Sequence, residues 1–309
     1  MADDLAAQLG VRMPSPLEVV RSAELDRLGT RLILKRDDRI HPQLSGNKWR
    51  KLQPNLEAAL AGGHDTLLTF GGAYSNHLRA VAAAGHLVGL QTVGAVRGEE
   101  HQPLNPTLTF AVARGMHLVY LDRQTYRDKG SPKVLDQLHR EFGDFYLVPE
   151  GGTNALAVRN CAEITREIEE PFDLICTPCG TGGTLAGMAA GLPPGSRALG
   201  FSALKGGDFL RDEVRRLQEV AFGTAFENWD IETGFHFGGF GRRTPELMEF
   251  VDQFEDHHGT PFEWVYVAKM LYGVIDLCRR GVVAPRSTVI AVITGPDEGV
   301  QSHNASWCC

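Results

Sequence analysis

The stretch Ser45-Gly46-Asn47-Lys48-Trp49-Arg50-Lys51-Leu52 sets the organisation of the chain. Serine and asparagine favour helix starts because their side-chain oxygens accept the free amides of a first turn, so a helix is expected to begin near Lys48. A helix N-terminus disfavours an ammonium by up to about 1 kcal/mol. The position therefore suits a lysine held neutral as an imine beside a phosphate. An ordinary solvated basic turn would also explain these residues.

A glycine-rich turn at Gly180-Thr181-Gly182-Gly183-Thr184 follows an apolar strand-like run and precedes a helical pattern. Successive amides and the helix N-terminus would cradle a phosphate there, and the threonine hydroxyls would add hydrogen bonds. A tight turn without a ligand is the alternative. Leu185 occupies the sixth place, where the GxGxxG dinucleotide fingerprint requires glycine, and no P-loop lysine is present. The turn thus argues against a nucleotide-binding oxidoreductase and against an NTPase.

Two further polar stretches, Gly72–His77 and Glu150–Ala155, also follow strand-like runs. In chain order the motifs SGNK, YSNH, GGTN and GTGGT resemble pyridoxal-phosphate enzymes of the tryptophan-synthase-β-like fold. Within that fold they are similar to the family of D-cysteine desulfhydrase and 1-aminocyclopropane-1-carboxylate (ACC) deaminase. The resemblance extends from about Pro14 to Glu298.

The resemblance implies an α/β fold with two open, twisted, mostly parallel sheets flanked by helices. It also implies a large cofactor-binding domain of residues 1–52 and 152–309 and a small domain of residues 53–151. The hydrophobic pattern agrees, because strand-like and helix-like segments alternate and such alternation favours parallel sheets. The expected strands are 31–35, 66–70, 91–96, 117–121, 145–148, 174–177, 198–203 and 288–294. The expected helices are 77–84, 106–114, 133–142, 154–168, 184–190, 245–257 and 264–280, and Pro54 is expected to start or kink the helix after the lysine stretch.

By the same resemblance, pyridoxal phosphate is the cofactor, and Lys48 binds it covalently and then serves as the base. Asn76 is expected to hydrogen-bond its phenolic oxygen, and Thr294 is expected to lie near its pyridine nitrogen. The phosphate is assigned to Gly180, Thr181, Gly182, Gly183 and Thr184. A hydroxyl at Thr294 would not enforce a pyridinium, which fits elimination chemistry.

The substrate side is expected to include Ser75 and Tyr266, which begins a Tyr-x-x-Lys pattern. His77 is expected either to face the substrate or to pack within its helix. Phe235 stands where the family has a second active-site tyrosine; a core position for Phe235 is the alternative. ACC deaminases carry glutamate directly after the tyrosine, where this chain has Val267.

These residues predict a pyridoxal-phosphate-dependent lyase that deaminates a small amino acid. D-cysteine desulfhydrase-like β-elimination to pyruvate and ammonia is favoured by His77, Val267 and the GGTNA stretch, whereas Tyr74, in place of the family's glutamine, and Phe235 count against it. ACC deamination is the alternative reaction. A non-catalytic or regulatory cofactor-binding protein is the alternative of another class, and the retained Lys48, Ser75 and Asn76 argue against it.

The composition is that of a globular protein with two domains. The chain has 309 residues and a net charge of −7, which implies no nucleic-acid partner. Its acidic start and short apolar runs predict a cytoplasmic protein without a membrane segment. The CxxC at Cys176 and Cys179 is expected to be a buried pair, and no metal site is expected. The expected partners are a small amino-acid substrate and a second copy of the chain.

Overall fold

The computed structural model describes residues 2–44, 46–259 and 262–295, and it divides into two compact units. The small unit contains the residues up to Gly10 and Lys51–Ala157, and the large unit contains Val11–Arg50 and the residues from Val158 onward. The first ten residues thus group with the small unit, where the sequence assigned them to the large one. Ser45 of the lysine stretch and Pro296–Glu298, which end the region of resemblance, lie outside the described residues.

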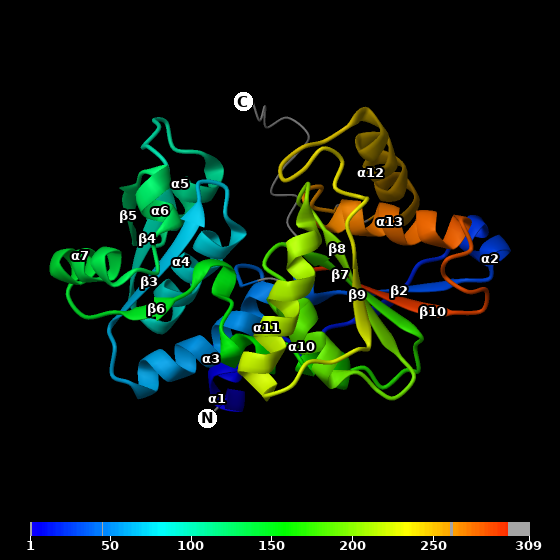
Figure 1. Ribbon diagram of the computed structural model, residues 1–309, viewed down its shortest axis with the longest axis horizontal. Helices are drawn as coiled ribbons and strands as arrows, with labels where there is room; N and C mark the ends of the chain where they lie inside the picture. Colours follow the sequence, from blue (N-terminus) through cyan, green and yellow to red (C-terminus); the bar gives the residue numbers. More distant parts are fainter. Residues whose placement is uncertain (1, 45, 260–261, 296–309) are drawn as a thin grey trace. The chain divides into compact units, whose positions relative to one another are not determined.

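The large unit is built on a six-stranded sheet in the order β1-β2-β10-β7-β8-β9 (Figure 1). All neighbouring strands are parallel except β1 and β2. Val289 of the central β10 pairs with Leu32 on one side and Leu174 on the other, and all three are strongly apolar. The strands are β1 Leu17–Val19, β2 Arg31–Lys35, β7 Leu174–Cys179, β8 Arg197–Ser202, β9 Trp229–Glu232 and β10 Thr288–Val292.

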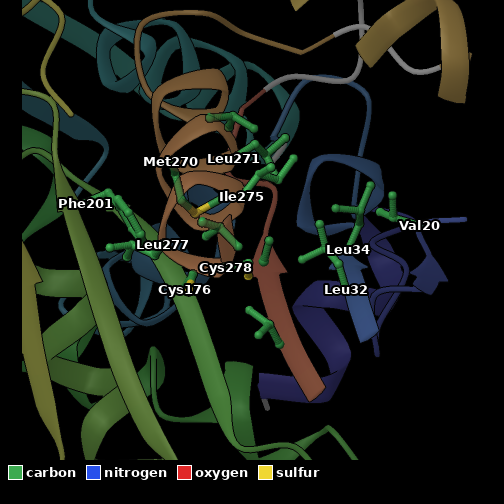
Figure 2. Close-up of a cluster of buried hydrophobic side chains, with 14 of the residues drawn as sticks. Val20, Leu32, Leu34, Cys176, Phe201, Met270, Leu271, Ile275, Leu277 and Cys278 are labelled. Carbon is green, nitrogen blue, oxygen red and sulfur yellow. The ribbon is translucent and has the colours of Figure 1, made fainter. Parts of the chain in front are cut away.

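Helices cover both faces of this sheet, as two neighbouring residues of β8 show. Phe201 meets Gly273 of α13, and Gly200 lies beneath Leu185 of α10, because successive strand residues point to opposite faces. Figure 2 shows the α13 side, where Met270 and Ile275 join the strand residues Leu32 and Cys176 in one buried cluster. The helices assigned wholly to this unit are α2 Ala23–Leu28, α9 Glu163–Arg166, α10 Gly183–Gly191, α11 Leu210–Phe222, α12 Pro245–His258 and α13 Val267–Arg279.

The small unit contains a four-stranded, all-parallel sheet in the order β5-β4-β3-β6. Its strands are β3 Thr66–Gly72, β4 Gln91–Arg97, β5 Met116–Leu121 and β6 Tyr146–Val148. Its helices are α1 Ala2–Gln8, α4 Asn76–Val88, α5 Pro106–Ala113, α6 Arg123–Arg127 and α7 Pro132–Phe142. Leu68, Phe70 and Val93 join Leu138 of α7 in its buried core. Two of the three boundaries between the units fall within α3 Asn47–Ala61 and α8 Ala155–Asn160, and the third follows Gly10. Short 3-10 turns occur at Asp37–Arg39, Glu150–Gly152 and Gly207–Phe209.

The fold class and the expected strands are confirmed, and three local expectations need correction. The single helix expected over 154–168 is two short helices, α8 and α9. The elements α1, α2, α6, α11, β1 and β9 were not among those expected. Pro54 does not end or restart α3. It cannot donate to the carbonyl of Arg50, four residues earlier, and the side-chain amide of Asn160 donates to that carbonyl instead at 2.8 Å.

Among the described residues, no helix combines the length and apolar character needed to cross a bilayer.

Candidate functional site

The lysine turn lies against the end of the last strand of the large unit. Gly46 has φ +67°, and a Cβ built on it would lie 1.9 Å from the carbonyl oxygen of Thr294. Only glycine permits both the left-handed backbone and this close approach. Tertiary packing therefore brings the lysine turn next to Thr294. By the resemblance, Lys48 of this turn and Thr294 are expected to bind the same cofactor.

The lysine turn is also tied to the glycine turn. The side-chain amide of Asn47 donates to the hydroxyl of Thr184 at 2.9 Å, and both residues are buried. Lys48 is half-buried, and its Nζ donates to Oδ1 of Asn47 at 3.2 Å. Asn47 therefore orients the lysine amine and fixes it relative to the first turn of α10.

The glycine turn has the backbone of an anion site. It connects β7 to α10, and Gly182 adopts φ +76° immediately before the helix. The N-cap residue of α10 is Gly182, which has no side chain to accept the first amides, whereas Ser75 caps α4 by accepting from two amides. Uncapped amides at a helix N-terminus attract anions. A Cβ at Gly182 would also lie 2.7 Å from Cγ2 of Val214, so any side chain there strains the turn.

Tyr266 stands beside this turn. A Cβ built on Gly180 would lie 3.3 Å from the Tyr266 hydroxyl oxygen, so that hydroxyl borders the glycine backbone. The Tyr266 backbone amide donates to Oε2 of Glu263 at 2.9 Å, which fixes the start of α13. Burial raises the pKa of Glu263, although the amides of Tyr266, Val265 and Val267 partly offset the effect.

Phe235 has the environment of a core residue. Its ring lies 6.0 Å from Phe201 and 6.3 Å from Tyr272, and a Cβ on Gly273 would approach it to 2.9 Å. Phe240, which the sequence analysis did not single out, instead contacts the Tyr266 ring edge-on at 5.6 Å and is 50% exposed. A glycine-rich loop after a strand was the available signal, but its three phenylalanines cannot be distinguished without the structure.

The YSNH stretch belongs to the small unit and is described there by itself. Ser75 is the cap of α4 and accepts from the amides of His77 and Leu78, and Asn76 is the half-buried first residue of that helix. His77 is 3% exposed, and its Nε2 lies 2.8 Å from the Thr69 hydroxyl. That hydroxyl donates to the carbonyl of Val148, so it accepts from an Nε2–H. Within its unit, His77 thus packs against the strands, which is the second of the two expected roles.

The GGTN stretch has local structural roles in the same unit. Nζ of Lys51 donates to the carbonyl of Gly151 at 3.2 Å and to the hydroxyl of Thr153 at 3.0 Å. Asn154 accepts from the amide of Ala157, which starts α8, and donates to Asn55. The CxxC cysteines, Cys176 and Cys179, are buried as expected.

A buried ionic network, which was not expected from the sequence, adjoins the lysine turn. Arg50 contacts Asp37 at 2.9 Å and Glu167 at 2.5 Å, and Lys35 contacts both carboxylates. Burial alone would raise the pKa of Asp37, but Arg50 and Lys35 outweigh it and hold that pKa below its usual value. The Asp37 carbonyl accepts from the amide of Gly46 at 2.8 Å, so the network supports the start of the lysine turn.

Another buried cation lies on α13. Lys269 is 1% exposed, and its Nζ donates to the carbonyl oxygens of His236 at 2.9 Å and Gly239 at 2.8 Å. Burial lowers the pKa of Lys269 to about 8, and the nearby Glu263 partly opposes that shift. This lysine belongs to the Tyr-x-x-Lys pattern, and its partners are backbone carbonyls.

Comparisons with known proteins agree with this geometry. The profile of the family described as pyridoxal-phosphate dependent enzyme matches residues 11–295. The bifunctional D-cysteine desulfhydrase/ACC deaminase of Arabidopsis thaliana is 31% identical, over 80% of this chain and 67% of its own length. The D-cysteine desulfhydrase of Salmonella typhi is 28% identical over 85% of each chain. The crystal structure of an ACC deaminase homologue superposes with a TM-score of 0.81 at 25% identity, covering 96% of this chain and 95% of that one.

The residues of the large unit fit the cofactor that this family uses. Lys48 supplies the amine for covalent attachment, and the uncapped amides after Gly182 suit a phosphate. A Cβ at Gly182 would fill part of that turn, and the hydrogen bond from Asn47 to Thr184 joins the lysine to it. On these grounds the chain belongs to the family of pyridoxal-phosphate dependent enzymes.

Proposed function

We propose that this lyase catalyses β-elimination from a small amino acid, with D-cysteine as the reference substrate. Cysteine and water would give pyruvate, ammonia and sulfide, which balances the atoms without an oxidant or reductant. The observation that carries the proposal is the hydrogen bond from Asn47 to Thr184, because it places an oriented lysine amine beside a turn suited to phosphate.

The chain's own residues supply binding, orientation and proton transfer. When bound, pyridoxal phosphate supplies an electron sink that stabilises negative charge at the substrate Cα. Nζ of Lys48, oriented by Oδ1 of Asn47, accepts the Cα proton. The Tyr266 hydroxyl, at the edge of the glycine turn, hydrogen-bonds the substrate side. Ser75 and Asn76 are assigned to substrate and to cofactor by the resemblance alone.

Val267 favours elimination over ACC deamination. It directly follows Tyr266, it is fully buried, and it packs in the hydrophobic cluster of α13. Opening the ACC ring requires an added nucleophile or acid, and ACC deaminases place a glutamate at this position. ACC deamination remains the second candidate, because the Arabidopsis relative carries both activities in its name.

The test is pyruvate release from a panel of D-cysteine, L-cysteine, β-chloro-D-alanine and ACC. Rapid release from D-cysteine and β-chloro-D-alanine, with little from ACC, supports the proposal. Pyruvate release from ACC alone would identify the protein as an ACC deaminase. Visible absorbance of bound cofactor without turnover of any substrate in the panel would favour a non-catalytic cofactor-binding protein instead.

We also propose that the protein is a cytoplasmic homodimer. Light scattering on the purified holoenzyme tests the dimer, and a monomeric mass at assay concentration would refute it.

A further inference from the structure

The loop between β9 and α12 contains turns but no helix or strand. Four of its residues have positive φ, namely Phe237 at 50°, Gly238 at 92°, Gly239 at 118° and Gly241 at 65°. A phenylalanine in the left-handed region is strained, so neighbouring groups must fix it. The Phe237 ring packs edge-on against Tyr272 at 4.9 Å, and this contact holds one side of the loop.

Lys269 holds the other side. Its buried ammonium donates to the carbonyls of His236 and Gly239, three residues apart on the loop. The Gly239 carbonyl also accepts from the amide of Arg242 at 3.1 Å. Hydrogen bonds from a charged donor are stronger than those between neutral groups, so one side chain fixes both ends of the turn.

The loop presents Phe240 to Tyr266. Phe240 directly follows Gly239, and its half-exposed ring meets the Tyr266 ring in a T-shaped contact at 5.6 Å. Phe235, which begins the same segment, is half-buried and packs against the hydrophobic cluster of α13 instead. Phe240 is thus the aromatic residue of this loop that contacts the Tyr266 ring, and Tyr266 in turn borders Gly180 of the glycine turn.

We propose that Lys269 is a positioning residue that holds loop 236–241, and that Phe240, so placed beside Tyr266, limits the size of the amino-acid side chain that is accepted. The inference rests on the proposed function, because it takes Tyr266 to lie on the substrate side. It places Phe240, and not Phe235, beside the substrate.

Limited trypsin digestion of the holoenzyme tests the positioning role without any substrate. Arg242 and Arg243 are exposed. The backbone amide of Arg242 donates to the Gly239 carbonyl, which also accepts from Lys269. Lys269→Met keeps the length of the side chain and removes its donor. Cleavage after Arg242 and Arg243 should become at least about tenfold faster, because the substitution removes both charged hydrogen bonds to the loop. Lys133→Met, at an exposed lysine of α7, should leave that rate unchanged.

Steady-state kinetics test the specificity role. Phe240→Ala, at a half-exposed position that the fold tolerates, should raise KM for D-cysteine several-fold and leave kcat nearly constant. The same variant should increase kcat/KM for the bulkier S-methyl-D-cysteine. Lys269→Met should shift KM in the same direction, and Lys269→Arg, which retains the charge, should partly restore it.

The outcomes separate the two parts. Wild-type cleavage rates in Lys269→Met would overturn the positioning role, whatever the substrate is. If Lys269→Met does not fold, the kinetics of Phe240→Ala still test the specificity role. Faster cleavage of Lys269→Met, together with an unchanged KM and an unchanged preference between D-cysteine and S-methyl-D-cysteine in Phe240→Ala, would overturn the specificity role. Absence of pyruvate release by the wild-type protein would instead refute the proposed function and leave the digestion result standing.

Discussion

Replacing Asp37 by asparagine should strongly destabilise the large unit. The buried network contains two cations, Lys35 and Arg50, and two carboxylates, Asp37 and Glu167, with exposures of 1%, 0%, 0% and 13%. Asparagine keeps the shape of the side chain but leaves one buried positive charge uncompensated. Breaking a buried pair in this way costs about 3–5 kcal/mol of unfolding free energy. That is a large share of the roughly 5–15 kcal/mol that a folded protein has in total.

Urea unfolding followed by tryptophan fluorescence measures this loss, because Trp49 is fully buried beside Arg50. Both proteins are compared at the same pyridoxal phosphate concentration, since a bound ligand adds stability. Asp212→Asn is the matched control. Asp212 is 89% exposed and pairs with Arg215 at 3.6 Å, so its loss should cost at most about 0.5 kcal/mol.

The effect should depend on pH in a defined direction. The pKa of Asp37 is lowered in the folded protein, so its stabilisation is fully present above the unfolded value of about 3.9 and is lost as pH falls through the lower folded value. The difference between wild type and Asp37→Asn should therefore be constant near neutral pH and shrink only in acid. Adding Arg50→Met to Asp37→Asn should cost less than the sum of the single changes, because it removes the excess cation. A loss below about 1 kcal/mol for Asp37→Asn, or additive costs, would refute the charge-balance argument.

Three further predictions concern the site and α13. Lys48→Ala should abolish covalent cofactor binding and turnover while the fold persists; borohydride reduction with peptide mapping checks this, and a label on another lysine would exclude Lys48. Thr184→Val should break the hydrogen bond from Asn47 and weaken pyridoxal phosphate binding several-fold in equilibrium titration. An unchanged affinity would show that this hydrogen bond does not contribute to cofactor binding. The pKa of Lys269 is about 8 in the folded protein against about 10.4 unfolded, so the unfolded chain binds more protons between these values. Wild-type stability should thus rise relative to Lys269→Met from pH 8 to about 10.4, by at most about 3 kcal/mol, and a flat difference in urea melts would contradict the lowered pKa of Lys269.

The sequence determined the elements whose signals are local. Period-two and near-continuous apolar runs gave β2, β3 and β10, and glycine or serine punctuation located the starts of α4 and α10. The four motifs in order identified the cofactor family, because each combines a turn with residues of specific chemistry. Elements were missed where local signals are weak, as at β9, which has only four residues.

The tertiary structure decided which of these residues meet. Asn47 and Thr184 are 137 residues apart in sequence, and no periodicity records their hydrogen bond. The close approach of Gly46 to Thr294 depends on parallel strand order, and the partners of Arg50 come from β2 and α9 with their flanking residues. Three phenylalanines within six residues look alike as sequence, yet Phe235 packs in the core and Phe240 lies against Tyr266. Local preference fixes each element, but the direction of a loop side chain depends on long-range packing, here on the ammonium of Lys269.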